Sequence, residues 1–506
     1  MTGAGKQFGR IAEIKLGLGY ISDVLRLIGE HRGLFLGTLA TGLGLRLLFF
    51  FWFPMVTDDS RVYMDLATNW LKHGVYGQTQ EVASANPRSA RETPKTKIVP
   101  IDSRLPGYPG FLAGIFWLFG VGNIRAVLVT QILVDLATCV IIADLARRLV
   151  SDRAGQAAFL LAALCPFLAN YTAAVLTETC EIFFTALALD CASGALDRMG
   201  LLGQVDRTGG MLWAGTGVAI GGCILLRPDG GILLASVLLY LLYLGMAKTS
   251  ASAFTAATLL GGVVLAVMAP WTMRNFKIMH HFQPLAPRYA NESDELVPRG
   301  FNRWVKTWMI DYASVEEIYW NVPGDKIDAT KLPSRAFDNP PQKEATLAVI
   351  EDYNDPQDLT PELDTRFGEI ATARIRAHPV RYFVVLPVLR VADMWLRPRT
   401  EILPPDVRWW EFDDDWKRSA VAVGFGLLNL AYMVAALWAA FWRRAAMRWM
   451  GLLVFFLLLR SALLLTLENP EPRYTLEGYP AVLVLAASLT RDRPADPSRF
   501  SLRDPS

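Results

Sequence analysis

The sequence has little of what soluble enzymes and metalloproteins usually depend on. Only 19% of its 506 residues are charged, and it holds five histidines and five cysteines. The cysteines lie in or beside apolar runs without the spacing of metal ligands, so we interpret them as apolar fillers. A formal net charge of +2 gives no support to a nucleic-acid partner. A P-loop, a dinucleotide-binding glycine motif and a nucleophile elbow are also missing, so soluble nucleotide or triad chemistry is unsupported.

What the sequence has instead is long apolar runs. Hydrophobic residues make up 52% of the chain. Since a bilayer is crossed by about 20 mostly apolar residues, these runs predict an all-α, polytopic membrane protein with roughly ten transmembrane helices. The expected spans are residues 33–54, 124–145, 156–174, 178–196, 211–227, 230–247, 252–272, 419–441, 449–466 and 475–490. Residues 1–32 carry mixed charge and no apolar run before a cleavage site, so we expect no cleaved signal peptide.

The charges of the short connections predict the orientation. With a cytoplasmic N-terminus, the basic clusters within 147–153, 198–207 and 443–448 fall inside, as the positive-inside rule requires. We therefore expect the inner (plasma) membrane of a bacterium, with both termini cytoplasmic. The chain then divides into an N-terminal membrane module (1–272) with a first outer loop (56–123), a large outer loop (273–418), C-terminal helices (419–490) and a cytoplasmic tail (491–506).

The two outer segments carry local signals of their own. Residues 60–73 have the spacing of an amphipathic helix lying on the membrane. Residues 78–100 are polar and rich in turn formers, which predicts a mobile loop. Residues 107–120 are apolar but too short to cross, which indicates a re-entrant or interfacial helix. Residues 378–396 are expected to dip into the interface.

Acidic and basic residues gather at the expected outer boundary, where charged side chains can line one cavity. They are Asp58, Asp59, Glu178, Glu181, Arg227, Asp229, Arg274, Glu468, Glu471 and Arg473, and Tyr474 lies beside the last of them. Nucleotide-activated sugars are absent from that face, so a transferase there needs a lipid-borne donor. Such a reaction needs a carboxylate to take a proton, cations to hold the departing phosphate and an apolar groove for the lipid tail. Asp59 suits the first role, and Arg104, Arg227, Arg274 or Arg473 the second.

A set of short motifs also runs in one order along the chain. They are Asp59-Ser60-Arg61-Val62-Tyr63, Arg104-Leu105-Pro106-Gly107-Tyr108-Pro109, Glu178, Arg227-Pro228-Asp229, Trp271-Thr272-Met273-Arg274-Asn275 and Arg473-Tyr474. In this order they resemble the GT-C superfamily of integral-membrane glycosyltransferases. The pattern is similar to the dolichyl-phosphate-mannose-protein mannosyltransferases and to the bacterial lipid A aminoarabinose transferase.

The resemblance implies a glycosyltransferase that moves a hexosyl or pentosyl group from a polyprenyl-phosphate donor. The acceptor would be a hydroxyl group of a glycan, lipid or protein at the non-cytoplasmic face. The implied residues fall into three groups. The catalytic carboxylates are Asp59, Asp58 and Glu178, the phosphate ligands are Arg104, Arg227, Arg274 and Arg473, and the substrate contacts are Tyr63, Tyr108 and Tyr474. A divalent cation is an open possibility, with Asp58, Asp59 and Glu178 as its oxygen ligands.

Each site residue also has a plainer interpretation. Asp59 could cap the helix that follows it. Glu178 could cap the N-terminus of the fourth span, where a negative charge is stabilising. Arg104 could be an interfacial side chain that reaches for the aqueous phase. Arg227 could belong to an ordinary helix-ending turn.

Three further expectations concern residues away from the site. Asp135, inside a span, should be neutral or paired with a neighbour such as Gln131, and Arg46 and Arg460 could join the same buried network. Trp304, Trp308 and Tyr312 favour an interfacial aromatic belt over a sugar-stacking surface. The main alternative function is a transporter or flippase, although the sequence shows no internal repeat of the transporter kind. A non-catalytic relative that binds lipid-linked sugars is a second alternative.

Overall fold

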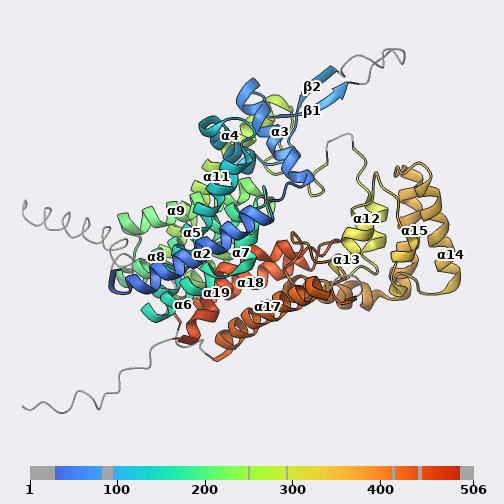
Figure 1. Cartoon of the computed structure of the whole chain (residues 1–506). Coiled ribbons are helices and arrows are strands. Elements are labelled where there is room, and N and C mark those ends of the chain that lie inside the picture. Colours follow the sequence, from blue (N-terminus) through green and yellow to red (C-terminus); the bar gives the residue numbers. More distant parts are fainter. Residues whose placement is uncertain are drawn as a thin grey trace, which may run out of the picture.

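Helices dominate the fold, and the all-α, polytopic prediction is confirmed. The computed structural model describes residues 29–82, 95–248, 251–291, 295–412, 416–442 and 447–490. In this part of the chain, seven helical stretches are long and apolar enough to cross a membrane (Figure 1). They are α2 (Arg32–Trp52), α5 (Ile124–Leu149), α8 (Glu178–Leu202), α9 (Arg207–Leu226), α10 (Gly231–Lys248) with the preceding turn η1 (Pro228–Gly230), α11 (Ala251–Ile278) and α17 (Trp416–Trp442).

The other three expected spans are shorter or interrupted helices. Residues 156–174 divide into α6 (Asp152–Ala163) and α7 (Pro166–Tyr171), with Pro166 in the first turn of α7. Residues 449–466 form α18 (Met450–Leu464). Residues 475–490 form α19 (Tyr479–Ala487) between the 3₁₀ turns η7 (Pro472–Gly478) and η8 (Ser488–Thr490). Every residue of α19 is buried, and it contacts α5, α6, α8 and α17. Its uniform hydrophobicity therefore matches a helix surrounded by protein.

A buried ion pair ties α2 to the bundle. The Arg46 side chain is fully buried, and its Nε donates to Asp135 Oδ2 at 2.6 Å. Its Nη1 also donates to the carbonyl of Ala163, at the end of α6. The expected buried network of Asp135 with Arg46 is thus confirmed, whereas Gln131, named as a possible partner of Asp135, instead accepts a hydrogen bond from the Tyr108 hydroxyl.

The first outer segment packs as α3 (Asp58–His73), a hairpin and α4 (Gly107–Phe119). Thr57 and Ser60 form a capping box at the start of α3, and Gly74 ends the helix in the left-handed conformation. The loop prediction for 78–100 was wrong at both ends, since β1 (Gly77–Val82) pairs antiparallel with β2 (Lys95–Pro100). The residues between the strands lie outside the described part of the chain.

The N-terminus of α4 presses directly on the end of α9. A Cβ at Gly107 would lie 2.5 Å from the carbonyl oxygen of Leu225, so only glycine fits there without a shift of the backbone.

The large outer segment forms a helical domain, here called the outer domain, beside the bundle (Figure 1). Its elements are α12 (Arg299–Val305), α13 (Tyr312–Ser314), the π-helix η2 (Val315–Tyr319), η3 (Ala329–Lys331), η4 (Ser334–Ala336), α14 (Pro340–Asn354), α15 (Pro361–Ala377), the π-helix η5 (Arg381–Val385) and α16 (Leu386–Leu396). Trp304 and Trp308 are fully buried in its core and Tyr312 is 5% exposed. The predicted aromatic belt was therefore wrong, because these rings hold the domain together.

The segment expected at the interface does present apolar side chains. Val380 just before η5, Phe383 on η5 and Val388 on α16 are each more than half exposed. That this segment dips into the interface stays a prediction.

Candidate active site

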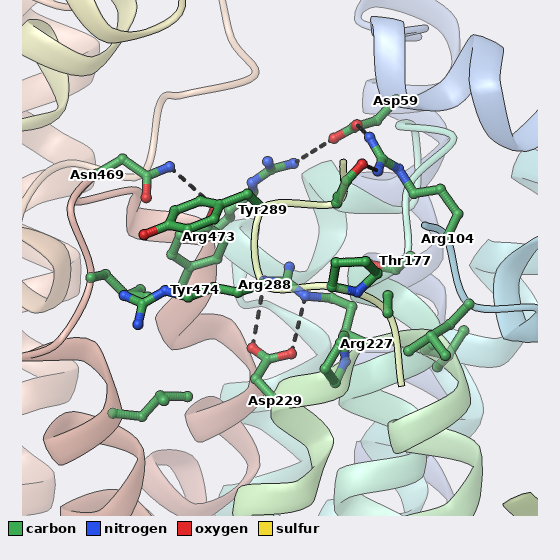
Figure 2. A pocket seen from close by; sticks show the side chains of 18 of the residues that line it. Asp59, Arg104, Thr177, Arg227, Asp229, Arg288, Tyr289, Asn469, Arg473 and Tyr474 are labelled. Carbon is green, nitrogen blue, oxygen red and sulfur yellow. Dashed lines mark hydrogen bonds and ion pairs between the residues drawn. The ribbon is translucent and has the colours of Figure 1, made fainter. Parts of the chain in front are cut away.

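A cavity of about 690 Å³ lies where the membrane helices meet both outer segments. Its walls come from α3, the start of α8, the turn between α9 and α10, residues 286–290 and residues 463–474. Figure 2 shows Asp59 and Arg104 on one side of this cavity and Asn469 on the other. The ordered motifs of the sequence thus converge on one space.

The Asp59 side chain lines this cavity, and its carboxylate does not cap a helix. Thr57 caps α3, so the capping interpretation of Asp59 does not apply. The Asp59 side chain is 37% exposed. Its oxygens lie 4.0 Å from Arg104 Nη2 and 3.6 Å from Arg473 Nη1. A carboxylate that faces both water and two guanidinium groups is placed to meet a hydroxyl group and a phosphate together.

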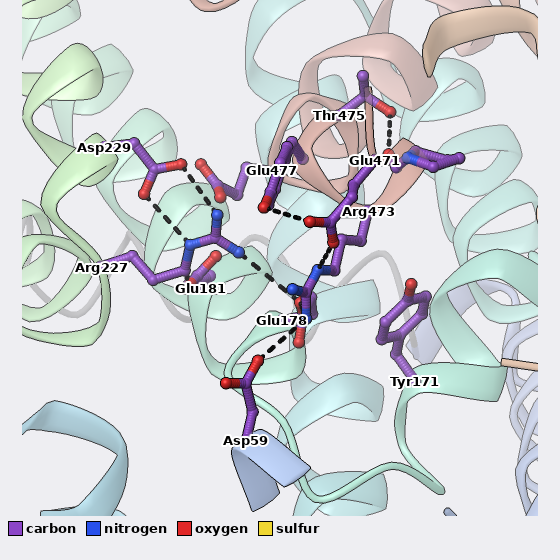
Figure 3. Close-up of polar contacts among 12 residues, drawn as sticks. Asp59, Tyr171, Glu178, Glu181, Arg227, Asp229, Glu471, Arg473, Thr475 and Glu477 are labelled. Carbon is purple, nitrogen blue, oxygen red and sulfur yellow. Dashed lines mark hydrogen bonds and ion pairs between the residues drawn. The ribbon is translucent and has the colours of Figure 1, made fainter. Parts of the chain in front are cut away.

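Glu178 lies deeper, between two arginines. It is 2% exposed, and its Oε1 lies 3.7 Å from Arg227 Nη1 and 3.8 Å from Arg473 Nη1 (Figure 3). Its other oxygen, Oε2, is buried without a hydrogen-bond partner in the structure. Glu178 therefore does more than open α8, since it holds the two guanidinium groups side by side.

A second group of charged side chains surrounds the Arg227 guanidinium. Its Nε lies 3.3 Å from Asp229 and 3.6 Å from Glu181. Arg460, fully buried on α18, pairs with Asp229 at 2.8 Å and with Glu477 at 2.7 Å. The expected link between Arg460 and Arg46 was wrong, because Arg460 belongs to this group. Removing any one partner would leave an uncompensated buried charge.

Arg473 is oriented by Glu471, which precedes η7, and lies beside Tyr474 of η7. Glu471 Oε2 accepts from Arg473 Nε at 2.5 Å, while Glu471 Oε1 accepts from the Tyr474 hydroxyl at 2.7 Å. Burial lowers the pKa of Arg473, but Glu471 and then Tyr474, Glu178 and Asp59 outweigh that effect and raise it above its ordinary value. The Tyr474 ring also lies 4.8 Å from the Arg227 guanidinium. Arg473 is therefore a fixed positive charge pointing at Asp59.

Three residues expected at the site lie elsewhere. The Asp58 side chain is 95% exposed, pairs with Arg61 and does not line the cavity. Arg274 donates to the carbonyls of Ile101 and Tyr76, so it fastens the first outer segment to α11. Tyr108 is fully buried and only supports the cavity wall. Its neighbour Tyr63, whose ring packs edge-on at 5.3 Å, does line the cavity.

The carboxylates proposed as metal ligands are not brought together. Asp58 points away to Arg61, and Arg473 lies between Asp59 and Glu178. Over the described ranges, no group of three or more histidine, cysteine, aspartate or glutamate residues could hold a metal ion. This donor set therefore does not fit a divalent cation.

The opposite wall of the cavity contains residues that sequence reasoning missed. Arg288 and Tyr289 come from the connection after α11, and Tyr319 comes from the outer domain. Arg288 Nη2 donates to both oxygens of Glu468 at 3.0 Å. A sequence separation of 180 residues gives no periodic signal by which this pair could have been found.

The family comparison bears on the central part of this site. Residues 103–273 match the model of the dolichyl-phosphate-mannose-protein mannosyltransferase family. The resemblance to the GT-C superfamily is confirmed over this segment. It includes Arg104, Glu178 and Arg227, whereas Asp59 and Arg473 lie outside it. No curated protein sequence matches the chain.

Solved structures give distant likenesses. The oligosaccharyltransferase of Archaeoglobus fulgidus with a tethered acceptor peptide matches at 13% identity and TM-score 0.49, over 91% of this chain and 49% of its own. The same archaeon's AglB, in complex with an inhibitory peptide and a dolichol-phosphate, gives 13% and 0.48, over 92% and 50%. ArnT of Cupriavidus metallidurans bound to undecaprenyl phosphate gives 13% and 0.35, over 91% and 77%. The chain thus spans about half the length of the archaeal enzymes, and TM-scores this low establish no common mechanism.

Proposed function

We propose that this protein is a glycosyltransferase that moves a sugar from a polyprenyl-phosphate donor to a hydroxyl acceptor at the non-cytoplasmic membrane face. The observation that carries the proposal is the position of Asp59. Its carboxylate is not used as a helix cap and lies in one cavity with Arg104 and Arg473. A donor of the lipid-phosphate kind also agrees with the family matched by residues 103–273. The transferred group is a hexosyl or pentosyl unit, and the acceptor is a glycan, a lipid or a protein.

The reaction follows from the placement of charge. The acceptor oxygen attacks the anomeric carbon of the sugar, and Asp59 takes the hydroxyl proton. The bond between that carbon and the phosphate oxygen breaks, and the electron pair leaves with the polyprenyl phosphate. Arg104, Arg227 and Arg473 are placed to stabilise the charge that gathers on the phosphate. The proton ends on Asp59, from which it can pass to water because the side chain is partly exposed.

The lipid tail has an apolar wall to lie against. Ile232 of α10 and Leu463 and Leu464 of α18 line the cavity on its membrane side. A polyprenyl chain that follows these side chains toward the bilayer would leave its phosphate among the arginines. Apolar and cationic walls in one cavity suit a lipid phosphate better than a free sugar phosphate.

The orientation rests on the two ends of the bundle. At the end of α5 away from the cavity, Arg147 and Arg148 both pair with Asp144. We place that end in the cytoplasm of a bacterial cell and the cavity outside its plasma membrane, with cytoplasmic termini. Cysteine labelling with an impermeant reagent tests this. A cysteine at Ser334 of the outer domain should react from outside, and one at the exposed Leu201 of α8 should be protected. The opposite pattern would reject the orientation.

The catalytic proposal is tested by transfer itself. Purified protein in lipid nanodiscs should release polyprenyl phosphate from a radiolabelled polyprenyl-phosphate sugar, and the label should move to an added acceptor. Donors of hexoses and pentoses and acceptors of the three classes should be tested together, with Asp59→Asn as the inactive control. A protein that carries the label across the bilayer without cleaving the donor would instead be a flippase.

A further inference from the structure

The wall of the cavity nearest the outer domain contains Arg288 and Glu468, and two further cations, Lys306 and Arg390, lie next to this pair outside the lining. Glu468 lies 3.0 Å from Arg288 and 3.5 Å from Lys306 Nζ. Arg390, fully buried on α16, donates to the carbonyls of Lys306 and Met309 at 3.1 Å. We call Arg288, Lys306, Arg390 and Glu468 the outer-wall cluster. Its ion pairs join Arg288 and Lys306 to Glu468, whereas Arg390 contacts backbone carbonyls.

The cluster also has unused donors. The Nε and Nη2 atoms of Arg390 are buried and lack a hydrogen-bond partner. Burial lowers the pKa of Arg390 to about 10. Burial, with Arg390 and Arg288 as neighbours, also lowers the pKa of Lys306, although Glu468 opposes the shift. Cations held this close to one another, with one carboxylate between them, favour a further anion.

The opposite side of the cavity differs in this respect. There Arg104, Arg227 and Arg473 already face carboxylates, including Asp59, Glu178, Asp229 and Glu471. In that set, three arginines face four carboxylates. The uncompensated charge therefore lies away from the proposed donor phosphate, across the cavity.

The elements that carry the cluster indicate which substrate it meets. Arg288 comes from the connection after α11, Lys306 from the outer domain and Glu468 from the loop after α18. Tyr289 and Tyr319 line the same wall and offer flat faces for a sugar ring. A molecule that enters along the outer domain would meet this wall first and then reach Asp59.

We propose that the outer-wall cluster binds a phosphate or carboxylate group carried by the acceptor, with Arg288 and Lys306 exchanging Glu468 for that group. This inference rests on the proposed function only in assigning the anion to the acceptor. It makes Arg288 and Lys306 determinants of acceptor specificity, and it makes Glu468 the built-in competitor that occupies them when no substrate is bound.

Direct binding tests the proposal without knowledge of the natural acceptor. The probes are glucose 6-phosphate, galacturonate and neutral glucose, added to the full-length protein in phosphatidylcholine nanodiscs. At least one of the two anionic sugars should bind more tightly than glucose. Arg288→Gln and Lys306→Met should each weaken its binding roughly tenfold, as the loss of one charge-assisted contact implies. Glu468→Gln should tighten it, because the competing charge is gone.

Matched controls separate this site from the donor site. Arg303→Gln, exposed on α12 outside the cavity, should leave all binding unchanged. Undecaprenyl phosphate should bind Arg288→Gln as it binds the wild type, whereas Arg104→Ala should weaken it. If Arg288→Gln weakens undecaprenyl phosphate as much as the anionic sugar, the cluster belongs to the donor and the acceptor assignment is overturned.

Two further outcomes reject one proposal each. If neither anionic sugar binds better than glucose, or if Glu468→Gln weakens their binding, the outer-wall cluster is a structural ion pair only. If the wild-type protein binds an anionic sugar but no undecaprenyl phosphate, the cluster stands as an anion site while the proposed transferase function fails.

Discussion

Replacing Asp59 by asparagine separates proton transfer from phosphate binding. The amide keeps the shape of the side chain but cannot take the proton of an attacking hydroxyl group. Turnover should therefore fall by roughly 10²–10⁴-fold, the usual contribution of general acid–base catalysis. The fold should be unaffected, since Thr57 caps α3 and the Asp59 side chain is 37% exposed.

The same substitution should change donor affinity in the opposite direction. Asp59 lies 3.6 Å from Arg473 and 4.0 Å from Arg104, so its charge competes with the donor phosphate for both. For partly exposed pairs such an interaction is worth at most about 1 kcal/mol, which corresponds to roughly fivefold tighter binding. Asp59→Asn should thus bind polyprenyl phosphate slightly more tightly while it turns over far more slowly.

The assay is release of lipid phosphate from a labelled donor, together with equilibrium binding of undecaprenyl phosphate, at matched expression. Asp58→Asn is the control, because the Asp58 side chain is 95% exposed, pairs with Arg61 and does not line the cavity. It should behave like the wild type. Near-normal turnover in Asp59→Asn with a dead Glu178→Gln would move the base to Glu178, and activity in all three variants would reject the transferase mechanism.

Three further outcomes follow from individual contacts. Arg104→Ala should weaken undecaprenyl phosphate binding roughly tenfold and Arg104→Lys should restore much of it, since a point charge still holds a phosphate; equal binding by the alanine variant would make Arg104 an interfacial residue. Gly107→Ala should lower the melting temperature and the yield, because a methyl group would lie 2.5 Å from the carbonyl oxygen of Leu225, and an unchanged melting temperature would contradict that packing. Burial raises the pKa of Asp393 to about 6, so the folded protein holds this proton more tightly than the unfolded chain does. The stability that Asp393 contributes is present below about pH 4 and is lost as the pH rises through about 6. The melting temperature of the wild type should therefore fall between these two pH values, and that of Asp393→Asn should fall less. Parallel curves of melting temperature against pH for the two proteins would refute this.

Much of the candidate site could be predicted because its members share one boundary of the bundle. Each of Asp59, Glu178, Arg227 and Arg473 stands next to the end of an apolar run, and the positive-inside rule assigns those ends to one side. Alternation of direction along the chain then brings together residues far apart in sequence. The structure agrees, since all four line one cavity.

What the sequence could not predict depends on contacts without a periodic signal. Trp304 and Trp308 recur at helical spacing, which is typical of both an interfacial belt and a buried core, and only the outer domain's own packing distinguishes the two. Arg274 follows the motif of a phosphate ligand, yet nearby carbonyls use its donors. The outer-wall cluster depends on how the outer domain docks, which no local pattern encodes.

The expected span at residues 475–490 shows a related limit of hydropathy. Hydropathy measures how apolar a segment is, but a helix enclosed by other helices is as apolar as one that faces lipid. The residues of α19 are buried on all sides, and its helix is too short to cross a bilayer alone. The sequence therefore predicted correctly that the segment is apolar and helical but not that it is an interior filler.

The position of α19 at the centre of the bundle has a consequence for synthesis. This helix fills a space among α5, α6, α8 and α17, yet the ribosome makes it after all of them. Those helices must remain in the membrane around an incomplete interior until the segment that contains α19 arrives. Glu471, Arg473 and Tyr474 immediately precede that segment, so they reach the cavity together with it. Filling of this interior and completion of the charged site are thus one event, and a nascent chain can acquire its reactive centre only after α19 has been made.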